Sequence, residues 1–315
     1  MGSQGDNFFE GAGFDWESYI VHRPAPDAQF YQLIYDHHRT NGGEFNLAHD
    51  IGTGPGNIAE QVGKAFKRVH ASEPSAYHTS VAEHRLKAID PDKFTTQQCG
   101  GEDISAAGHK SGSVDLITVA QCIPLMKVDQ AISGFAKLLK PNGTVAIWFY
   151  GRPAFADPSQ QRSQLIINQI LSKAWDRVRP MKGTGFEAAK IMLCAFLDNV
   201  SFPEADWKQV RRVKWNHDKP MMFLEDDDVD FEIKWDSQVR KDESEEKIID
   251  RDFWAIDADV AWMRGFVDYA LPWENKDEEK AQFDGLFREL ELSMGGKEKK
   301  QRITWPVALL LATKK

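Results

Sequence analysis

The sequence of 315 residues predicts an α/β fold, a mostly parallel sheet with helices on both faces. Three observations support this prediction. Apolar, β-branched runs alternate with helical stretches over residues 19–150, as in successive strand–helix–strand units. The run at 113–121 is apolar almost throughout, as a strand buried on both faces must be. A glycine-rich turn at 52–56 follows the first strand, and open sheets bind ligands where their strands end.

Composition fits one soluble globular chain, either a single core or a core with a cap, because 42% of residues are hydrophobic and 28% charged. The net charge of −9 argues against a nucleic-acid partner, since phosphate binding needs a basic face. We expect no secretory signal, no membrane partner and a cytoplasmic location, because the longest apolar run, 307–312, is too short to cross a bilayer. Three widely spaced cysteines indicate reduced thiols, with no disulfide frame or metal site.

The amino-terminal half of the chain accounts for most of the sheet. We expect a flexible, glycine-rich tail at 1–18. Asp27 is expected to cap the helix that begins at residue 28. The expected helices lie at 28–38, 57–66, 78–88 and 129–139. The first expected strand ends at residue 51, and the next four span 69–73, 94–99, 113–121 and 143–150. Residues 19–150 therefore form the predicted core.

The second half is expected to add a cap. Residues 151–302 contain predicted helices at 160–178, 186–197, 257–271 and 277–294, a strand at 207–215, and a surface hairpin at 221–235 with an acidic insertion. The last core strand is expected within residues 303–315, over 303–312. The sequence contains no internal repeat, and it is compatible with either a monomer or a homodimer.

The turn itself reads Asp50-Ile51-Gly52-Thr53-Gly54-Pro55-Gly56. Glycine allows positive φ and close approach of a ligand to the backbone. The dinucleotide pattern G-x-G-x-x-G fails here, because Asn57 stands in the place of the third glycine. An ordinary strand-to-helix turn is the alternative to a ligand site.

A second acid supports the ligand site. Glu73 ends the second predicted strand 21 residues after Gly52 (73 − 52), with Pro74 next to it. At that strand tip a carboxylate can accept both hydroxyls of a ribose, although it could also be a loop-capping acid. Ala120 and Gln121 end the fourth strand at the same edge of the sheet.

The form Asp-x-Gly-x-Gly-x-Gly, together with Leu138-Leu139-Lys140-Pro141-Asn142-Gly143 before the fifth strand, resembles class I S-adenosylmethionine (SAM) methyltransferases. The resemblance implies SAM as cofactor and a Rossmann-like sheet of seven strands, whose last strand is antiparallel, plus a helical or hairpin cap. It also implies that Glu102 or Asp103 contacts the adenine, although either could be a solvated acid. The implied cofactor-binding residues are Asp50, Gly52, Thr53, Gly54, Gly56, Glu73, Pro74, Glu102, Asp103, Ala120 and Gln121.

Within that class, the chain is most similar to the trans-aconitate methyltransferase-like group, which includes fungal members. In this group a Tyr…Arg-Pro segment lies over the methionine end of SAM and the substrate mouth. By this resemblance Tyr19 and Arg23 line the site, unless they are a helix-entry loop with a surface arginine. Residues 121–126 read Gln-Cys-Ile-Pro-Leu-Met where the group has Gln-Ala-Ala-His-Trp-Phe, which favours a larger, more apolar acceptor than a small polyacid. Trp148 and Trp262 are expected to line the pocket, while core packing explains most other tryptophans.

We therefore expect an enzyme that transfers the SAM methyl group to an oxygen, carboxylate or hydroxyl, of a small organic acid or secondary metabolite. A carboxylate needs no base, whereas a phenol or enol would want one. His22, His37 and His38 are candidates near the mouth, but a helix-face role suits each better, so no base is assigned. The alternatives are a SAM-binding fold that catalyses a cyclase-like step, and a binding protein acting through the acidic residues 225–230.

Overall fold

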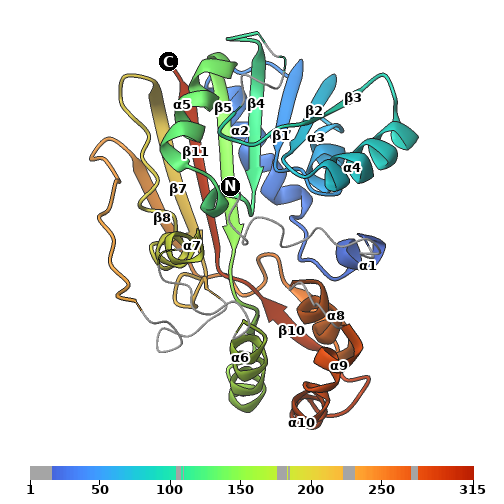
Figure 1. Cartoon of the computed structure of the whole chain (residues 1–315). Helices are drawn as coiled ribbons and strands as arrows, with labels where there is room; N and C mark the ends of the chain where they lie inside the picture. Colours follow the sequence, from blue (N-terminus) through green and yellow to red (C-terminus); the bar gives the residue numbers. More distant parts are fainter. Residues whose placement is uncertain are drawn as a thin grey trace.

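The computed structural model describes residues 16–103, 108, 110–175, 183, 185–222, 231–270 and 276–315. Its main sheet has eight strands in the order β3-β2-β1-β4-β5-β11-β7-β8 (Figure 1). All neighbouring pairs are parallel except those that β11 makes with β5 and β7. The strands are β1 (Leu47–Ile51), β2 (Arg68–Glu73), β3 (Phe94–Gln98), β4 (Val114–Ala120), β5 (Leu139–Tyr150), β7 (Trp207–Trp215), β8 (Ser244–Ile248) and β11 (Val307–Lys314).

Helices cover both faces of this sheet, because successive residues of each strand point to opposite sides. On β5, Trp148 joins the core cluster beneath the first set of helices, whereas Ile147 joins the cluster beneath the second. The first set comprises α2 (Ala28–Thr40), α3 (Asn57–Val62) and α4 (Ala76–Ile89), and the second comprises α5 (Val128–Leu138) and α7 (Gly185–Cys194). The predicted fold class is thus confirmed.

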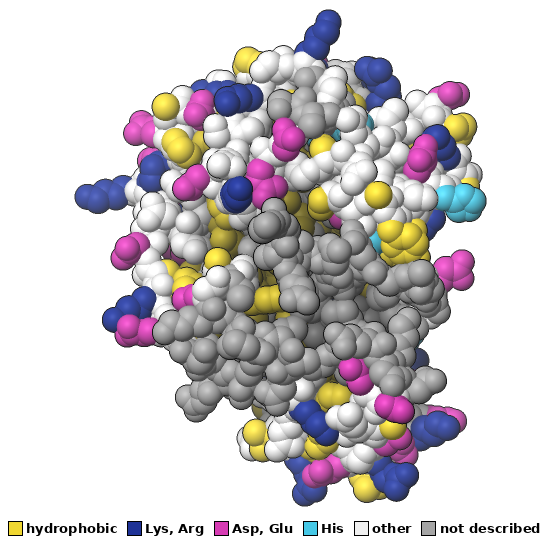
Figure 2. Space-filling model, in the orientation of Figure 1, with side chains coloured by type: hydrophobic (Ala, Val, Ile, Leu, Met, Phe, Trp, Pro, Cys, Tyr) yellow, Lys and Arg dark blue, Asp and Glu magenta, His cyan; other side chains and the backbone are white. Residues whose placement is uncertain are grey.

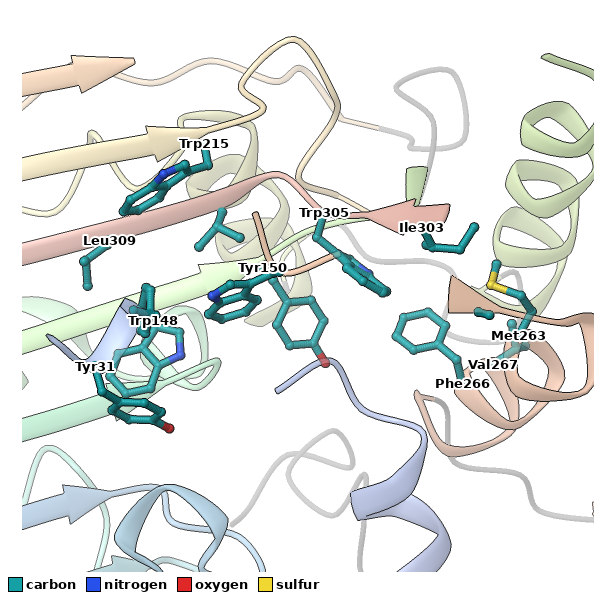
Figure 3. Close-up of a cluster of buried hydrophobic side chains, with 14 of the residues drawn as sticks. Tyr31, Trp148, Tyr150, Trp215, Met263, Phe266, Val267, Ile303, Trp305 and Leu309 are labelled. Carbon is teal, nitrogen blue, oxygen red and sulfur yellow. The ribbon is translucent and has the colours of Figure 1, made fainter. Parts of the chain in front are cut away.

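A cap lies beyond the carboxyl ends of the parallel strands (Figure 1). Its parts are α1 (Trp16–Val21), α6 (Gln161–Trp175), α8 (Val260–Ala270), α9 (Lys276–Ala281), α10 (Asp284–Met294) and a small sheet of β6 (Ala154–Phe155), β10 (Gln301–Thr304) and β9 (Ile256–Ala258). One hydrophobic cluster runs from the sheet into this cap, with the Tyr150 ring between Trp148 and the cap residues Trp305 and Phe266 (Figure 3). Core and cap therefore share one interior.

Several boundaries differ from the sequence prediction. The main sheet has an eighth strand, β8, which pairs only with β7. Trp16–Val21 is helical, where a tail was expected to residue 18. The predicted strand 303–312 is two strands, because Trp305 and Pro306 separate β10 from β11. The predicted helix 277–294 is likewise divided into α9 and α10.

The acidic insertion at 225–230 and residues 1–15 lie outside the described residues. On the face shown in Figure 2, basic and acidic side chains are interspersed over both the sheet domain and the cap. Among the helices that the structure describes, none is both long enough and apolar enough to cross a membrane.

Candidate active site

The glycine turn leaves β1 in a backbone conformation that favours glycine at three positions. Gly52, Gly54 and Gly56 have φ of 66°, 54° and 89°, and Gly56 is the N-cap of α3. A Cβ on Gly52 would lie 2.5 Å from the Sγ of Cys122. A Cβ on Gly54 would meet no described atom within 4 Å. The backbone at Gly54 is therefore open to a ligand, while Gly52 is packed against the protein.

Glu73 lies directly against this turn. Its side chain ends β2, is 8% exposed, and accepts a hydrogen bond from the Gly54 N–H through Oε2 at 3.0 Å. Its Oε1 accepts from the Ser75 N–H at 3.4 Å and lies 3.6 Å from Nδ1 of His78. The Thr53 N–H donates to the Ser72 carbonyl at 3.0 Å, which fixes the turn beside β2. The structure thus joins the turn and the acid that the spacing predicted.

Asp50 is buried beneath the turn and is 1% exposed. The hydroxyls of Thr53 and Thr118 donate to its two carboxylate oxygens at 2.6 and 2.8 Å. Burial raises the pKa of Asp50 to about 6, and the negative charge of Glu73 adds to this effect, while the two hydroxyl contacts oppose it. Asp50 therefore connects the turn to β4.

At the end of β4, Gln121 has a φ of 65°, which is uncommon for a residue other than glycine. Its backbone N–H donates to the Trp148 carbonyl at 2.9 Å, which holds the backbone of Gln121 next to β5. Its Nε2 is buried and has no hydrogen-bond partner among the residues that the structure describes. A buried donor of this kind needs an acceptor, and a ligand at this edge of the sheet could supply one.

The remaining acids lie further out. Glu102 accepts a hydrogen bond from the Lys127 N–H at 3.1 Å, and Asp103 is exposed. Pro74 is exposed, and its carbonyl accepts from Nε2 of Gln98 at 3.0 Å. A Cβ on Gly101 would lie 2.6 Å from Sδ of Met126, so this segment packs on the loop after β4.

Helix α1 brings Tyr19 and Arg23 to the carboxyl end of β5. The guanidinium of Arg23 lies 4.7 Å from the Tyr19 ring centroid and 5.7 Å from that of Tyr150. Trp262 is half-buried, and its Nε1–H donates to the Val21 carbonyl at 3.3 Å. Trp262 therefore holds α1 against the cap.

Trp148 was expected to line the pocket, and the structure corrects this. It is 1% exposed, and its ring packs edge-on against Phe30 at 5.4 Å and Tyr31 at 6.4 Å. The period-two pattern of β5 turns its side chain into the core beneath α2. In the stretch 121–126, Ile123 and Pro124 are buried in the 3-10 helix η2 (Ile123–Leu125), whereas Leu125 is exposed.

Two of the candidate histidines lie away from the mouth. His37 lies 3.1 Å from the Thr313 hydroxyl and His38 lies 2.9 Å from the Thr144 hydroxyl, near the opposite end of the sheet. Burial lowers the pKa of both, that of His37 to about 4. The third, His22, has Nδ1 2.8 Å from the Ser18 carbonyl and packs on α8.

The sequence did not mark two residues that the structure brings to the site, Trp16 and His78, and it pointed to a third, Tyr150, only by its position in the chain. Trp16 of α1 packs its ring edge-on against His78 at 4.8 Å, and His78 approaches Glu73. Trp16 fell within the expected tail, so no local signal marked it. Tyr150, which stands with the other aromatic residues at the tip of the fifth predicted strand, lies beside Arg23.

The main sheet has the strand order β3-β2-β1-β4-β5-β11-β7-β8, and the glycine turn and the acid of Glu73 lie together at the carboxyl ends of β1 and β2. This combination defines a class I methyltransferase architecture. Comparison with known proteins agrees. Residues 49–145 match the model of a methyltransferase domain family. Methyltransferase pgmE of Aspergillus terreus is 35% identical over 95% of this chain and 93% of its own length. Methyltransferase ptaI of Pestalotiopsis fici is 36% identical over 97% and 94%.

The fold comparison extends over most of the chain. A protein assigned as a type II methyltransferase from Anaeromyxobacter dehalogenans superposes with a TM-score of 0.56, covering 92% of this chain and 97% of that one at 16% identity. The chain belongs to the class I SAM-dependent methyltransferases, and SAM is its cofactor. The similarity to pgmE covers 95% of the chain and so extends well past the predicted core at 19–150. The trans-aconitate-like subgroup stays a prediction.

The residues present fit this cofactor. The open backbone of Gly54 allows a ligand to approach closely. The carboxylate of Glu73 offers hydrogen-bond acceptors, and the side-chain amide of Gln121, which has no partner among the described residues, offers a donor. These are the groups that a ribose and an amino acid need.

Proposed function

We propose that this enzyme transfers the methyl group of SAM to an oxygen, carboxylate or hydroxyl, of a small organic acid or secondary metabolite. The observation that supports it most is the 3.0 Å contact between the Gly54 N–H and Glu73, which joins the open turn to a strand-tip acid. We assign cofactor binding to the predicted set, Asp50, Gly52, Thr53, Gly54, Gly56, Glu73, Pro74, Glu102, Asp103, Ala120 and Gln121.

Within this set the roles differ. Glu73 accepts the sugar hydroxyls, and Gly54 admits the ligand to the backbone. Gly56 lets the start of α3 pack closely on Leu86, and Asp50 with Thr53 fixes the turn. Gln121 donates to the ligand at the end of β4. Tyr19 and Arg23 of α1 line the acceptor side, with Trp262 as a support of α1.

When bound, SAM supplies a methyl group on an already activated sulfonium. The task of the protein is then to align the acceptor and exclude water. The histidines proposed for this mouth are engaged elsewhere, His37 and His38 at the far end of the sheet and His22 against α8. This arrangement favours an acceptor oxygen that is ionised before transfer, as a carboxylate is at neutral pH. The relatives are fungal methyltransferases, which agrees with a secondary metabolite as acceptor.

The test is incubation with SAM that carries a labelled methyl group and a panel of organic acids and phenols. We expect label in an acceptor, recovered as an ester or ether. Tight SAM binding with no label in any acceptor would favour the cyclase-like alternative instead.

A further inference from the structure

Arg23 is a half-buried cation that forms no ion pair with a carboxylate of the described residues. Its guanidinium lies against the rings of Tyr19 and Tyr150. Burial opposes its charge, and the phenol oxygens of Tyr150 and Tyr19 more than offset this, which raises the pKa of Arg23. A partly desolvated cation is stabilised further by an anion placed against it.

Tyr150 adds a second unsatisfied group at the same place. It is 4% exposed, and its hydroxyl lies beside the guanidinium without a hydrogen-bond partner of regular geometry in the described parts of the chain. Burial raises the pKa of Tyr150, so the phenol stays protonated and can donate. A guanidinium and a phenol O–H together offer only donors, which suits an oxygen anion.

Their position separates these donors from the sugar end of the cofactor site. The strand order β2-β1-β4-β5 places Tyr150 three strands from Glu73, about 14 Å at the usual strand spacing. Gln121 lies between them, because its N–H is bonded to the Trp148 carbonyl of β5. The pair therefore lies on the β5 side of the turn, with Gln121 between it and Glu73.

We propose that Arg23 and Tyr150 bind a carboxylate of the methyl acceptor, so that the acceptor class is an organic acid with an aromatic or apolar body. This inference rests on the proposed function and narrows it. The aromatic rings around the pair support the apolar body: Tyr19 stacks on the guanidinium, and Trp254 lies 6.0 Å from the Tyr150 ring.

A carboxylate also fits the chemistry. One of its oxygens can be held by Arg23 and Tyr150 while the other attacks. The O–CH₃ bond forms as the CH₃–S bond breaks, the sulfonium becomes a neutral thioether, and the carboxylate charge is lost in the ester. No proton is released, so the step needs no base.

The experiment compares matched probes on the full chain loaded with S-adenosylhomocysteine (SAH). Benzoate, cinnamate and 2-naphthoate are titrated beside their amides, which have the same shape and no charge, with binding followed by calorimetry and ligand-observed NMR. At least one carboxylate should bind about tenfold more tightly than its amide, and Arg23→Gln should abolish this preference, because a charge-assisted bond is lost. Tyr150→Phe should weaken the carboxylate several-fold and leave the amide unchanged.

The controls are matched in kind. Arg39→Gln removes an exposed arginine paired with Asp36, and Tyr35→Phe removes another buried hydroxyl without a described partner, so neither should alter the preference. The inference is overturned if no carboxylate is preferred over its amide, or if the preference survives in Arg23→Gln. It is also overturned if Arg23→Gln weakens SAH but not 5′-methylthioadenosine, which lacks the amino-acid part, since the cofactor carboxylate would then be the partner. Failure of the wild-type protein to bind SAH would instead refute the proposed function.

Discussion

Both carboxylate oxygens of Glu73 accept hydrogen bonds from backbone N–H groups, those of Gly54 and Ser75. The acid and the turn are therefore joined before a ligand binds. We predict that Glu73→Ala lowers SAH affinity at least about tenfold, because hydrogen bonds to a charged acceptor are lost. Calorimetric titration measures this, with Glu83→Ala, on the exposed side of α4, as the control. Wild-type affinity in Glu73→Ala would refute the ribose role, and an unchanged melting temperature would show that the fold persists.

Gly52 and Gly54 have similar φ values but different surroundings, so their alanine variants should differ. Gly52→Ala forces a methyl group onto Cys122 and should destabilise the fold by about 1–3 kcal/mol. Both variants strain the left-handed backbone, but Gly54→Ala meets open space and lacks the clash, so it should lose less stability than Gly52→Ala. Gly54→Ala should lose SAH affinity, because the methyl group occupies the ligand side of the turn. Urea unfolding and SAH titration separate the two effects. Partial rescue of Gly52→Ala by Cys122→Ala would confirm the clash, and equal effects of both variants would contradict it.

The pKa of Asp50 gives a prediction with a definite sign. Its folded-state pKa is raised from 3.8 to about 6, so the folded protein holds this proton more tightly than the unfolded chain. The contribution of Asp50 to stability is therefore full below pH 3.8 and is lost as pH rises through about 6. The free energy of unfolding of the wild type, measured relative to Asp50→Asn, should fall across this window and stay level above it. A difference independent of pH would exclude the assigned shift.

At the scale of elements, α1 connects the cofactor side of the core to the cap. Trp16 contacts His78 at the start of α4, while Val21 accepts a hydrogen bond from Trp262 of α8. His22 packs so closely on α8 that only glycine fits at position 265. Both ends of this short helix are thus held by partners far away in the chain.

We predict that Gly265→Ala displaces α1, because a Cβ there would lie 2.1 Å from the His22 ring. Hydrogen exchange of the α1 amides should accelerate, and SAH affinity should fall. Gly285→Ala is the matched control, since it also adds a methyl group to a cap helix but meets no described atom within 4 Å. Equal protection of α1 in both variants would contradict this role of Gly265.

At the scale of the whole molecule, the sequence predicted the parts whose signals are local. The glycine turn and Glu73 lie within one strand–helix–strand unit, so their spacing determines their proximity. Strand β8 was missed because Ser244–Ile248 has no buried face and takes its position from β7. Helix α1 was missed because its partner Trp262 is 241 residues from Val21. The apolar run of β5 indicated burial but could not show which face receives Trp148.

Because one hydrophobic cluster extends from the sheet into the cap, we expect the two to unfold together. Calorimetry should give a single transition whose calorimetric and van't Hoff enthalpies agree. Tryptophan fluorescence should follow it with the same midpoint, since Trp148 of the sheet and Trp305 beside the cap report on both parts. Two separated transitions would show that the cap is an independent unit.

The two outermost strands of the main sheet, β3 and β8, have one further consequence. Each presents backbone groups that another chain could pair with, the usual route to fibrous aggregation. The sequence of β3 is Phe-Thr-Thr-Gln-Gln and that of β8 is Ser-Glu-Glu-Lys-Ile, so both strands offer little apolar surface for such pairing. In stacked copies of β8, the glutamates of neighbouring chains would also repel one another. The rims of the sheet therefore help the folded enzyme remain dispersed at high concentration.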